Sequence, residues 1–423
     1  MIDEPTSQPG IAAIADDPKA VFIATMAREL HLAGIATDAL ESTLMNIAAS
    51  IDLPVQIFAL PTNITIAVGP RWNQKVVMMR LEPSSVNLRK ISLLNLIYDD
   101  LRLGKIDYRQ ASRLLGEIDT RWPGISPLWE IPALALVAIG VAILLGGGVS
   151  ELFVAGLIGL VTGIISAFAK NNAVIARLFE VIAAFAGTLI VGLTSHFIGP
   201  TNVYIAIVAG VVVLLPGYSL TLALHELANG DLVAGVARLG KVLSTLLALG
   251  CGALLGFAIL GPHLLQSGDI HTHPVPSRFW ILAAVLMSVG LSIDLDARLR
   301  DFVWVFAASF MALLTSHLLA DTAVHQISAF ASAFICGLVA NLGARFLRIP
   351  QSVMLVPALL VLVPGSLSYK SVLFAFQQNI DAALILGANA AVAAVQLVAG
   401  LLLSQLVFPS SPLRLQGKSG LSR

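Results

Sequence analysis

The sequence predicts a polytopic α-helical membrane protein, with ten transmembrane helices in two inverted five-helix repeats behind a small α+β cytoplasmic domain. Three observations predict this fold class. Of 423 residues, 57% are hydrophobic and only 12% are charged, against roughly 25% charged in soluble domains. Residues 1–123 hold 26 of the 50 charged residues. Beyond Pro123, apolar stretches of about 20 residues, the length that crosses a bilayer, follow one another.

The first 123 residues divide into a tail and a domain. Residues 1–18 are acidic, contain Pro and Ser, and lack the apolar core of a secretory signal, which predicts a disordered tail that stays on the side of synthesis. Residues 19–123 alternate between helical and strand periodicity, which predicts the α+β domain. Helical spacing covers 22–30, 40–47, 88–102 and 107–120, and β-rich runs separated by turn residues cover 54–60, 64–68 and 76–81.

Ten apolar segments follow. The first five belong to repeat one, residues 124–261, and the last five belong to repeat two, residues 279–408. Residues 409–423 are predicted to be a cytoplasmic tail. The predicted spans are 128–146, 150–169, 176–197, 201–222, 240–261, 279–294, 302–320, 322–343, 350–369 and 381–408. Loops on the side of the N-terminal domain carry eleven Lys and Arg residues, and those on the other side carry two. Since cytoplasmic loops carry the excess of positive charge, both termini are expected in the cytoplasm, with the spans in the cell (inner) membrane.

A Pro-Gly pair marks the internal repeat. Leu215-Pro216-Gly217 recurs as Val363-Pro364-Gly365, 148 positions later. The same offset carries each of the first five spans onto one of the last five, which indicates two repeats. Because five is odd, the second repeat must enter the membrane from the opposite side, so the halves are inverted. Inverted repeats are typical of secondary transporters, although a duplicated channel or scaffold would show the same pattern.

The Pro-Gly pairs are the predicted substrate site. Proline removes a helical hydrogen bond and glycine loosens the chain, so both spans should break and expose backbone groups suited to a carboxylate or an ammonium. The alternative is a pair of kinks that only improve packing. The residues predicted to bind substrate are Pro216, Gly217, Tyr218, Ser219, Pro364, Gly365, Ser366, Tyr369 and Asn389.

Ionisable groups in or beside the spans are candidates for proton coupling or a gate. Glu180 is either a desolvated carboxylate that binds a proton or the partner of Arg177, three residues earlier. His225, Glu226 and Asp231 form a polar cluster that is either a gate and coupling site or a solvated loop. His225-Glu226 also resembles the start of a zinc-binding His-Glu-x-x-His motif, but position 229 is Asn.

Several classes of function are excluded or disfavoured. The formal net charge is zero without a basic run, which argues against a nucleic-acid partner. Cys251 and Cys336 lie in apolar stretches and read as free residues. His263, His271 and His273 fit a polar external loop better than a metal site, so no metal, cofactor or enzymatic activity is predicted. A small-molecule substrate and the lipid bilayer are the expected partners, and homo-oligomer formation stays open.

The chain resembles the threonine/serine exporter family. The resemblance covers roughly residues 20–408 and rests on Leu215-Pro216-Gly217, on the run from Asn229-Gly230-Asp231 to Arg238, on Leu362 to Ser366, and on the stretches 31–37 with Glu41 and 87–90. It implies proton-driven export of threonine or serine by alternating access. Because some relatives are linked with dicarboxylate export, a succinate-like substrate is the alternative, and a membrane-embedded enzyme or a channel are more distant ones.

Overall fold

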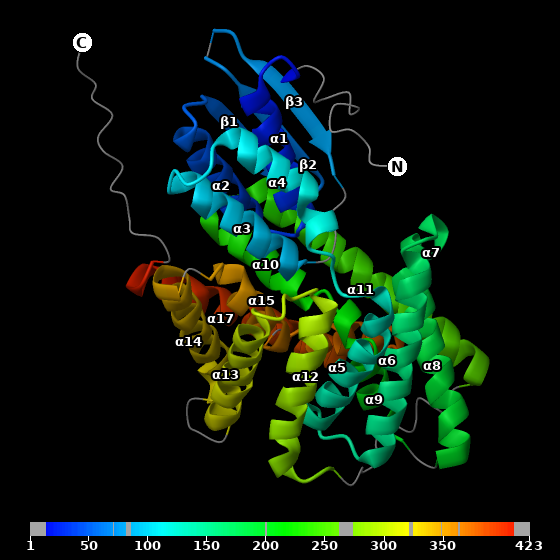
Figure 1. Cartoon of the computed structure of the whole chain (residues 1–423). Helices are drawn as coiled ribbons and strands as arrows, with labels where there is room; N and C mark the ends of the chain where they lie inside the picture. Colours follow the sequence, from blue (N-terminus) through cyan, green and yellow to red (C-terminus); the bar gives the residue numbers. More distant parts are fainter. Residues whose placement is uncertain are drawn as a thin grey trace.

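The computed structural model describes residues 14–70, 72–81, 86–198, 201–261, 274–320, 325–347, 349–362 and 364–409. We call residues 14–121 the N-terminal domain and the described residues from Pro127 onward the helical domain. Figure 1 shows the N-terminal domain, blue to cyan, stacked on one end of the larger helical domain. The predicted histidine loop, with His263, His271 and His273, lies outside the described residues.

The N-terminal domain packs four helices against a three-stranded sheet. In chain order these are α1 (Pro18–Leu32), α2 (Thr37–Ser50), β1 (Val55–Leu60), β2 (Asn63–Val68), β3 (Lys75–Arg80), α3 (Leu88–Arg102) and α4 (Tyr108–Arg121). The sheet has the order β1-β2-β3 with both pairs antiparallel, which confirms the sheet predicted from the β-rich runs. Its inward residues Ile64, Ile66 and Val77 are fully buried.

Helix α1 begins where the sequence pattern changes. Pro18 occupies the first turn, where its missing N–H needs no partner, and the Asp17 carboxylate accepts hydrogen bonds from the backbone N–H groups of Lys19 and Ala20. Ile14 is buried in the core. The predicted disordered tail, 1–18, therefore extends too far: residues 14–17 belong to the folded domain, and residues 1–13 lie outside the described residues.

The helical domain contains the apolar segments. Its elements are η3 (Pro127–Trp129), α5 (Glu130–Leu144), α6 (Val149–Ala169), α7 (Ala173–Arg177), α8 (Phe179–Ile198), α9 (Val203–Gly210), η4 (Val212–Leu214), α10 (Gly217–Asn229), α11 (Leu232–Leu260), η7 (Ser277–Phe279), α12 (Trp280–Asp294), α13 (Phe302–Ala320), η8 (His325–Ile327), α14 (Ser328–Leu342), the π-helical turn η9 (Gly343–Leu347), α15 (Gln351–Leu362), α16 (Gly365–Phe376) and α17 (Ile380–Val407).

Within the described residues, seven helices are long and apolar enough to cross a membrane, or eight if a pair bent by 60°, Val203–Gly210 and Val212–Asn229, forms one span. The predicted third and sixth spans correspond to shorter apolar helices, Phe179–Ser195 and Trp280–Asp294. The predicted beginning of the third span, residue 176, is wrong. The chain turns at Leu178 instead, so Arg177 ends α7 and Glu180 lies in α8.

Small residues let the helices approach closely, as their spacing of four suggests. A Cβ added to Gly159 would lie 2.8 Å from the Cα of Ala135, and one added to Gly163 would lie 2.7 Å from the Cα of Ile131. Both contacts bring α6 against α5. On α11, a Cβ at Gly256 would lie 2.6 Å from the Cβ of Thr188 on α8. No larger residue fits at these three positions unless the helices move apart.

The helices pair in the same way in each half of the helical domain. In the first half α5 packs on α6, α8 on α11 and α10 on α11; at the corresponding places in the second half α12 packs on α13, α14 on α17 and α16 on α17. Between the halves α5 packs on α12. The segments that follow the two Pro-Gly pairs cross over, because α10 also packs on α17 and α16 also packs on α11.

Candidate functional site

The two predicted helix breaks are present and lie against each other. Pro216 (φ −79°, ψ 36°) precedes α10, and Pro364 (φ −76°, ψ 28°) precedes α16 in nearly the same conformation. A Cβ added to Gly365 would lie 3.2 Å from the Cβ of Leu215 and 3.3 Å from the Cα of Gly217. The Pro-Gly pairs therefore meet at a tight crossing between the halves.

The cavity lies farther along α10, toward the N-terminal domain, rather than at the crossing. It has a volume of about 110 Å³ and is enclosed by five segments: the loop and first turn of α2, one residue of α3, and parts of α10, α15 and α17. Its lining residues are Gly34, Ile35, Ala36, Asp38, Ala39, Ile91, Tyr218, Thr221, Leu222, His225, Gln351, Ser352, Leu355, Val356, Leu359, Leu401 and Gln405. The N-terminal domain thus forms one wall of a cavity in the helical domain.

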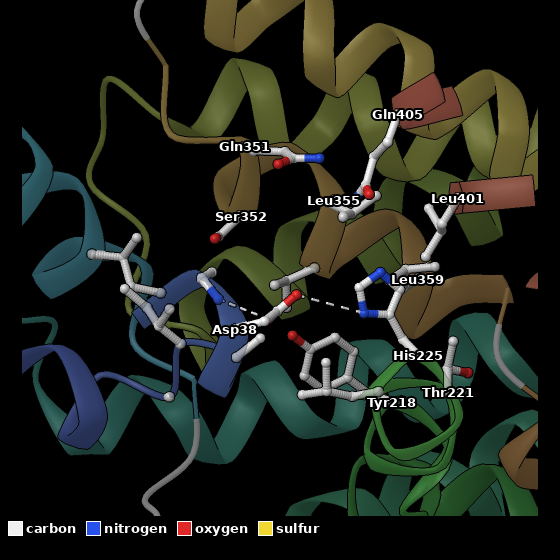
Figure 2. Close-up of a pocket in the computed structure, with 17 residues that line it drawn as sticks. Asp38, Tyr218, Thr221, His225, Gln351, Ser352, Leu355, Leu359, Leu401 and Gln405 are labelled. Atoms are coloured by element: carbon white, nitrogen blue, oxygen red, sulfur yellow. Dashed lines mark hydrogen bonds and ion pairs between the residues drawn. The ribbon is translucent and has the colours of Figure 1, made fainter. Parts of the chain in front are cut away.

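Polar side chains converge on this cavity from different segments. Figure 2 shows Asp38 of the N-terminal domain facing Tyr218 and His225 of α10 across the same space. The Asp38 Oδ2 lies 3.9 Å from His225 Nδ1. The Asn229 amide donates to Asp38 Oδ2 at 3.3 Å and lies 3.3 Å from His225 Nδ1. Since that amide can only donate to the ring nitrogen, Nδ1 is assigned as the acceptor and Nε2 as the protonated nitrogen.

One hydroxyl on the cavity wall is buried without a partner. Thr221 is 1% exposed, and its Oγ1 makes no hydrogen bond to any described residue. Its counterpart 148 positions later, Tyr369, is fully buried, and its hydroxyl is also without a described partner. Each residue stands five positions after the proline of its own break. Buried hydroxyls normally find partners; of these two residues only Thr221 lines the cavity, so it is the one that a ligand there could contact.

The N-terminal domain docks on α10 and α11 through a hydrogen bond to a buried ion pair. Glu226 is fully buried, and Arg238 donates to both of its carboxylate oxygens, at 2.9 and 2.7 Å. Thr37, at the start of α2, donates its hydroxyl to Glu226 Oε1 at 2.9 Å. We call these three residues, with the Asp38–Asn229 contact, the first docking point. The predicted gate residue Glu226 is thus satisfied by an arginine and by the N-terminal domain.

A second docking point joins the N-terminal domain to the turn between α12 and α13. Arg89 is buried and donates to Asp296 Oδ2 at 2.8 Å, and Ser92 donates to Asp301 Oδ2 at 2.7 Å. The backbone N–H groups of Leu88 and Arg89 donate to the carbonyls of Leu295 and Asp296. Because the first docking point lies on the first half of the helical domain, the N-terminal domain bridges the two halves.

Two carboxyl groups near the first docking point have raised pKa values. Burial raises the pKa of Asp231, which caps α11, and the negative charges of Asp38 and Glu226 raise it further. Burial also raises the pKa of Glu41 on α2, against a backbone hydrogen bond from Ala59 that lowers it. Acidic side chains from both domains therefore meet here at close range.

The structure separates the other predicted site residues. Tyr218 and His225 line the cavity, whereas Ser219 and Ser366 are half-buried beside the breaks and Asn389 is exposed on α17. Arg177 is exposed, and among the described residues it forms no ion pair with Glu180. Of the two interpretations of Glu180, the described contacts do not support the ion pair with Arg177, because the chain turns between the two residues.

Sequence reasoning missed the part of the site that the N-terminal domain supplies. Asp38 belongs to no motif, and Thr37 is only the end of the family-like stretch 31–37; the contacts of both lie about 190 positions away along the chain. Ser352 and Thr221 look like ordinary polar residues at helix positions. Among the described residues, no group of three or more His, Cys, Asp and Glu side chains could hold a metal ion.

Comparisons with known proteins find one family over most of the chain. Residues 21–260 match a family model for threonine/serine exporters, ThrE, and residues 280–407 match a second, described as "Threonine/Serine exporter, ThrE". A protein of Mycobacterium tuberculosis named "Probable threonine/serine exporter" is 25% identical over 92% of this chain and 76% of its own length.

Yeast proteins named "Pheromone-regulated membrane protein 10" are also similar. The one from Pichia sorbitophila is 24% identical over 85% of this chain and 37% of its own length. The one from Candida albicans is 25% identical over 85% of this chain and 34% of its own length. The chain thus spans only about a third of these relatives. No solved structure matches the chain.

Proposed function

Because the chain belongs to the threonine/serine exporter family, we propose that it is a secondary transporter that exports threonine and serine from the cytoplasm by alternating access. In this proposal ten helices cross the cell (inner) membrane as two inverted repeats, and both termini and the N-terminal domain are cytoplasmic. The family assignment and the apolar helices make the chain a multi-pass membrane protein. The crossing of the two breaks is where the halves would move against each other.

The observation that carries this proposal is a difference between two symmetry-related places. Near the start of α9, on the proposed external side, the Tyr204 hydroxyl donates to Gln377 Oε1 at 2.6 Å, and the Tyr204 ring stacks on Phe374 with centroids 5.2 Å apart. The offset of 148 relates Tyr204 to Ser352 and Gln377 to Asn229. No described hydrogen bond joins that second pair, and Ser352 lines the cavity instead. The Tyr204–Gln377 contact closes the proposed external side, whereas the corresponding place on the proposed cytoplasmic side is a cavity. Alternating access requires such a difference between the two sides.

The cavity favours an amino acid over a dicarboxylate. Its one carboxylate among the lining residues is Asp38, and no lysine or arginine lines it. A dicarboxylate would therefore meet a like charge without a cation to offset it, whereas the ammonium group of an amino acid would meet an opposite charge. This distribution of charge supports threonine or serine as the substrate.

Proton coupling is proposed at Asp231 rather than at Glu180. In the docked state, burial and the charges of Asp38 and Glu226 raise the Asp231 pKa. When the N-terminal domain moves away, the charge of Asp38 and the burial that this domain causes are removed, so the pKa falls toward the ordinary value of about 3.9. The docked state therefore binds the proton more tightly. Docking should therefore strengthen as the pH falls from the raised pKa toward the ordinary value, and this contribution should be lost as the pH rises through the raised pKa.

Gradient-driven transport in proteoliposomes tests both the export function and its coupling. We expect wild-type protein to move labelled threonine faster when protons can flow in the opposite direction. Asp231→Asn should lose most of this stimulation, because the amide cannot take up the proton, while energy-independent exchange continues. Glu180→Gln, which removes a carboxylate remote from the cavity, is the matched control. If Glu180→Gln loses the stimulation and Asp231→Asn keeps it, the coupling group has been misassigned.

Labelling of single cysteines tests the topology. After Cys251 and Cys336 are replaced by alanine, cysteines at the exposed positions Val149 and Pro274 should react with an impermeant maleimide added to intact cells. Cysteines at the exposed positions Asn171 and Leu299 should react only after the cells are permeabilised. Reversed labelling at any two positions would contradict the inverted arrangement.

A further inference from the structure

We propose that the cavity under the N-terminal domain is a binding site for a zwitterionic hydroxy amino acid, and that Asp38 of the N-terminal domain contacts its ammonium group directly. This inference rests on the proposed export function for the substrate class and adds a place and a set of contacts. It also gives the N-terminal domain a role: the domain completes the substrate site rather than standing apart from it.

The size of the cavity fits a small amino acid. The cavity has a volume of about 110 Å³. This is roughly seven to eleven times the smallest cavity volume that holds one water molecule. The ratio is similar to the number of non-hydrogen atoms in threonine. The walls are mostly apolar, with Ile35, Leu355 and Leu359 among the lining residues. These side chains suit the methyl group of threonine and leave orientation to the few polar groups.

The ammonium group has one matching partner. Asp38 is the only acidic residue among those that line the cavity. Its Oδ2 accepts a hydrogen bond from the Asn229 amide of α10 at 3.3 Å, whereas its Oδ1 accepts no described hydrogen bond from α10. His225 Nδ1 lies 3.9 Å from the Asp38 carboxylate and 3.3 Å from the same amide. In Figure 2 the Tyr218 hydroxyl points into the space below the Asp38 carboxylate. An ammonium there can donate to the carboxylate and to the phenol oxygen.

The substrate hydroxyl and carboxylate have partners on α10 and α15. The Thr221 Oγ1 is buried, lines the cavity and has no described partner, so a substrate hydroxyl would restore a missing hydrogen bond. Gln351 and Ser352 form the first turn of α15 and line the cavity. First-turn N–H groups have no acceptor within their own helix, and together with the Ser352 hydroxyl they suit a carboxylate.

Both docking points hold the N-terminal domain over this site. Asp38 immediately follows Thr37, whose hydroxyl bonds the buried Glu226, and Ile91 of the cavity wall adjoins Ser92, which bonds Asp301. A substrate in the cavity would therefore be covered on one side by the N-terminal domain until the domain moves or the halves rearrange. The amino acid and the N-terminal domain would stabilise each other's position.

Direct binding of labelled threonine to the purified full-length protein in nanodiscs tests the site. Asp38→Asn should lower the affinity for threonine at least tenfold, because the ammonium loses its ion pair. Asp52→Asn, the same change at an exposed position of the same domain, should bind threonine like the wild type. Saturable wild-type binding that is unchanged by Asp38→Asn, or the absence of saturable binding, would overturn the proposal.

A second variant separates binding from docking, since Asp38 also contacts Asn229. Thr221→Val removes an unpartnered hydroxyl that takes part in neither docking point, so the fold should tolerate it. We expect threonine and serine to bind severalfold more weakly to this variant while alanine, which lacks the hydroxyl, binds equally well. Equal loss for all three amino acids would contradict the assigned contact.

Transport measurements on the same variants distinguish the site from the function. If Asp38→Asn and Thr221→Val bind and export threonine like the wild type, the cavity is not the site, although the export function stands. If threonine binds with the expected dependence on Asp38 but the proteoliposomes move none, the site stands and the export function is wrong.

Discussion

Gly365→Leu is expected to reduce transport to less than a hundredth of the wild-type rate in a protein that still folds in the membrane. A Cβ at this position would already lie 3.2 Å from the Cβ of Leu215 and 3.3 Å from the Cα of Gly217, so the rest of a leucine would force the two breaks apart. Overpacking of this kind costs about 1–3 kcal/mol, which most folded proteins survive. The same overpacking would stop transport, however, because the crossing must shift during each transport cycle.

Labelled-threonine exchange in proteoliposomes, together with the yield and monodispersity of the purified variant, measures this effect. Gly240→Leu is the matched control, because it lies on α11 with open space where a Cβ would stand. It should transport at close to the wild-type rate. Near-normal exchange by Gly365→Leu would mean that the crossing is a static packing feature and that the halves move elsewhere.

Arg238→Met is expected to cause the largest loss of stability. It leaves the fully buried Glu226 without its bidentate partner, and an unpaired buried charge costs about 3–5 kcal/mol. The same loss should loosen the first docking point, since Thr37 bonds that carboxylate. Thermal unfolding of the purified protein and protease sensitivity of the linker around Pro123 would show both effects.

A double variant makes this prediction specific. Adding Glu226→Leu to Arg238→Met removes the buried charge, so most of the lost thermal stability should return, while docking stays weak without the acceptor for Thr37. Arg102→Met, an exposed arginine of the N-terminal domain, should change the unfolding temperature little. If Arg238→Met is as stable as Arg102→Met, the ion pair does not hold the domains together.

Local patterns were enough to predict much of the fold. Strand and helix periods gave the sheet and all four helices of the N-terminal domain, and the Pro-Gly pairs gave both helix breaks, because each of these features depends on neighbouring residues. The break at Leu178 was missed because no Gly or Pro marks it, and the flanking Arg177 and Glu180 fit a continuous helix equally well. Short amphipathic turns at a membrane surface leave little trace in periodicity.

The site was predictable only in part, because it is assembled over long sequence distances. Tyr218 and His225 were found through their nearness to the Pro-Gly break and to other polar residues. Asp38 was not, since its place in the cavity depends on how the N-terminal domain docks. Glu226 drew attention as a charge beside a span, but its partner Arg238 lies beyond the turn at Gly230. Spacing within one helix could not reveal that pair.

Counterflow tests the central claim most directly. Proteoliposomes containing the wild-type chain are loaded with unlabelled threonine and diluted into a trace of labelled threonine without any ion gradient. The account predicts transient accumulation of label that external serine suppresses, that external succinate leaves unchanged, and that Gly365→Leu abolishes. No accumulation of threonine, or accumulation that only succinate supports, would contradict it.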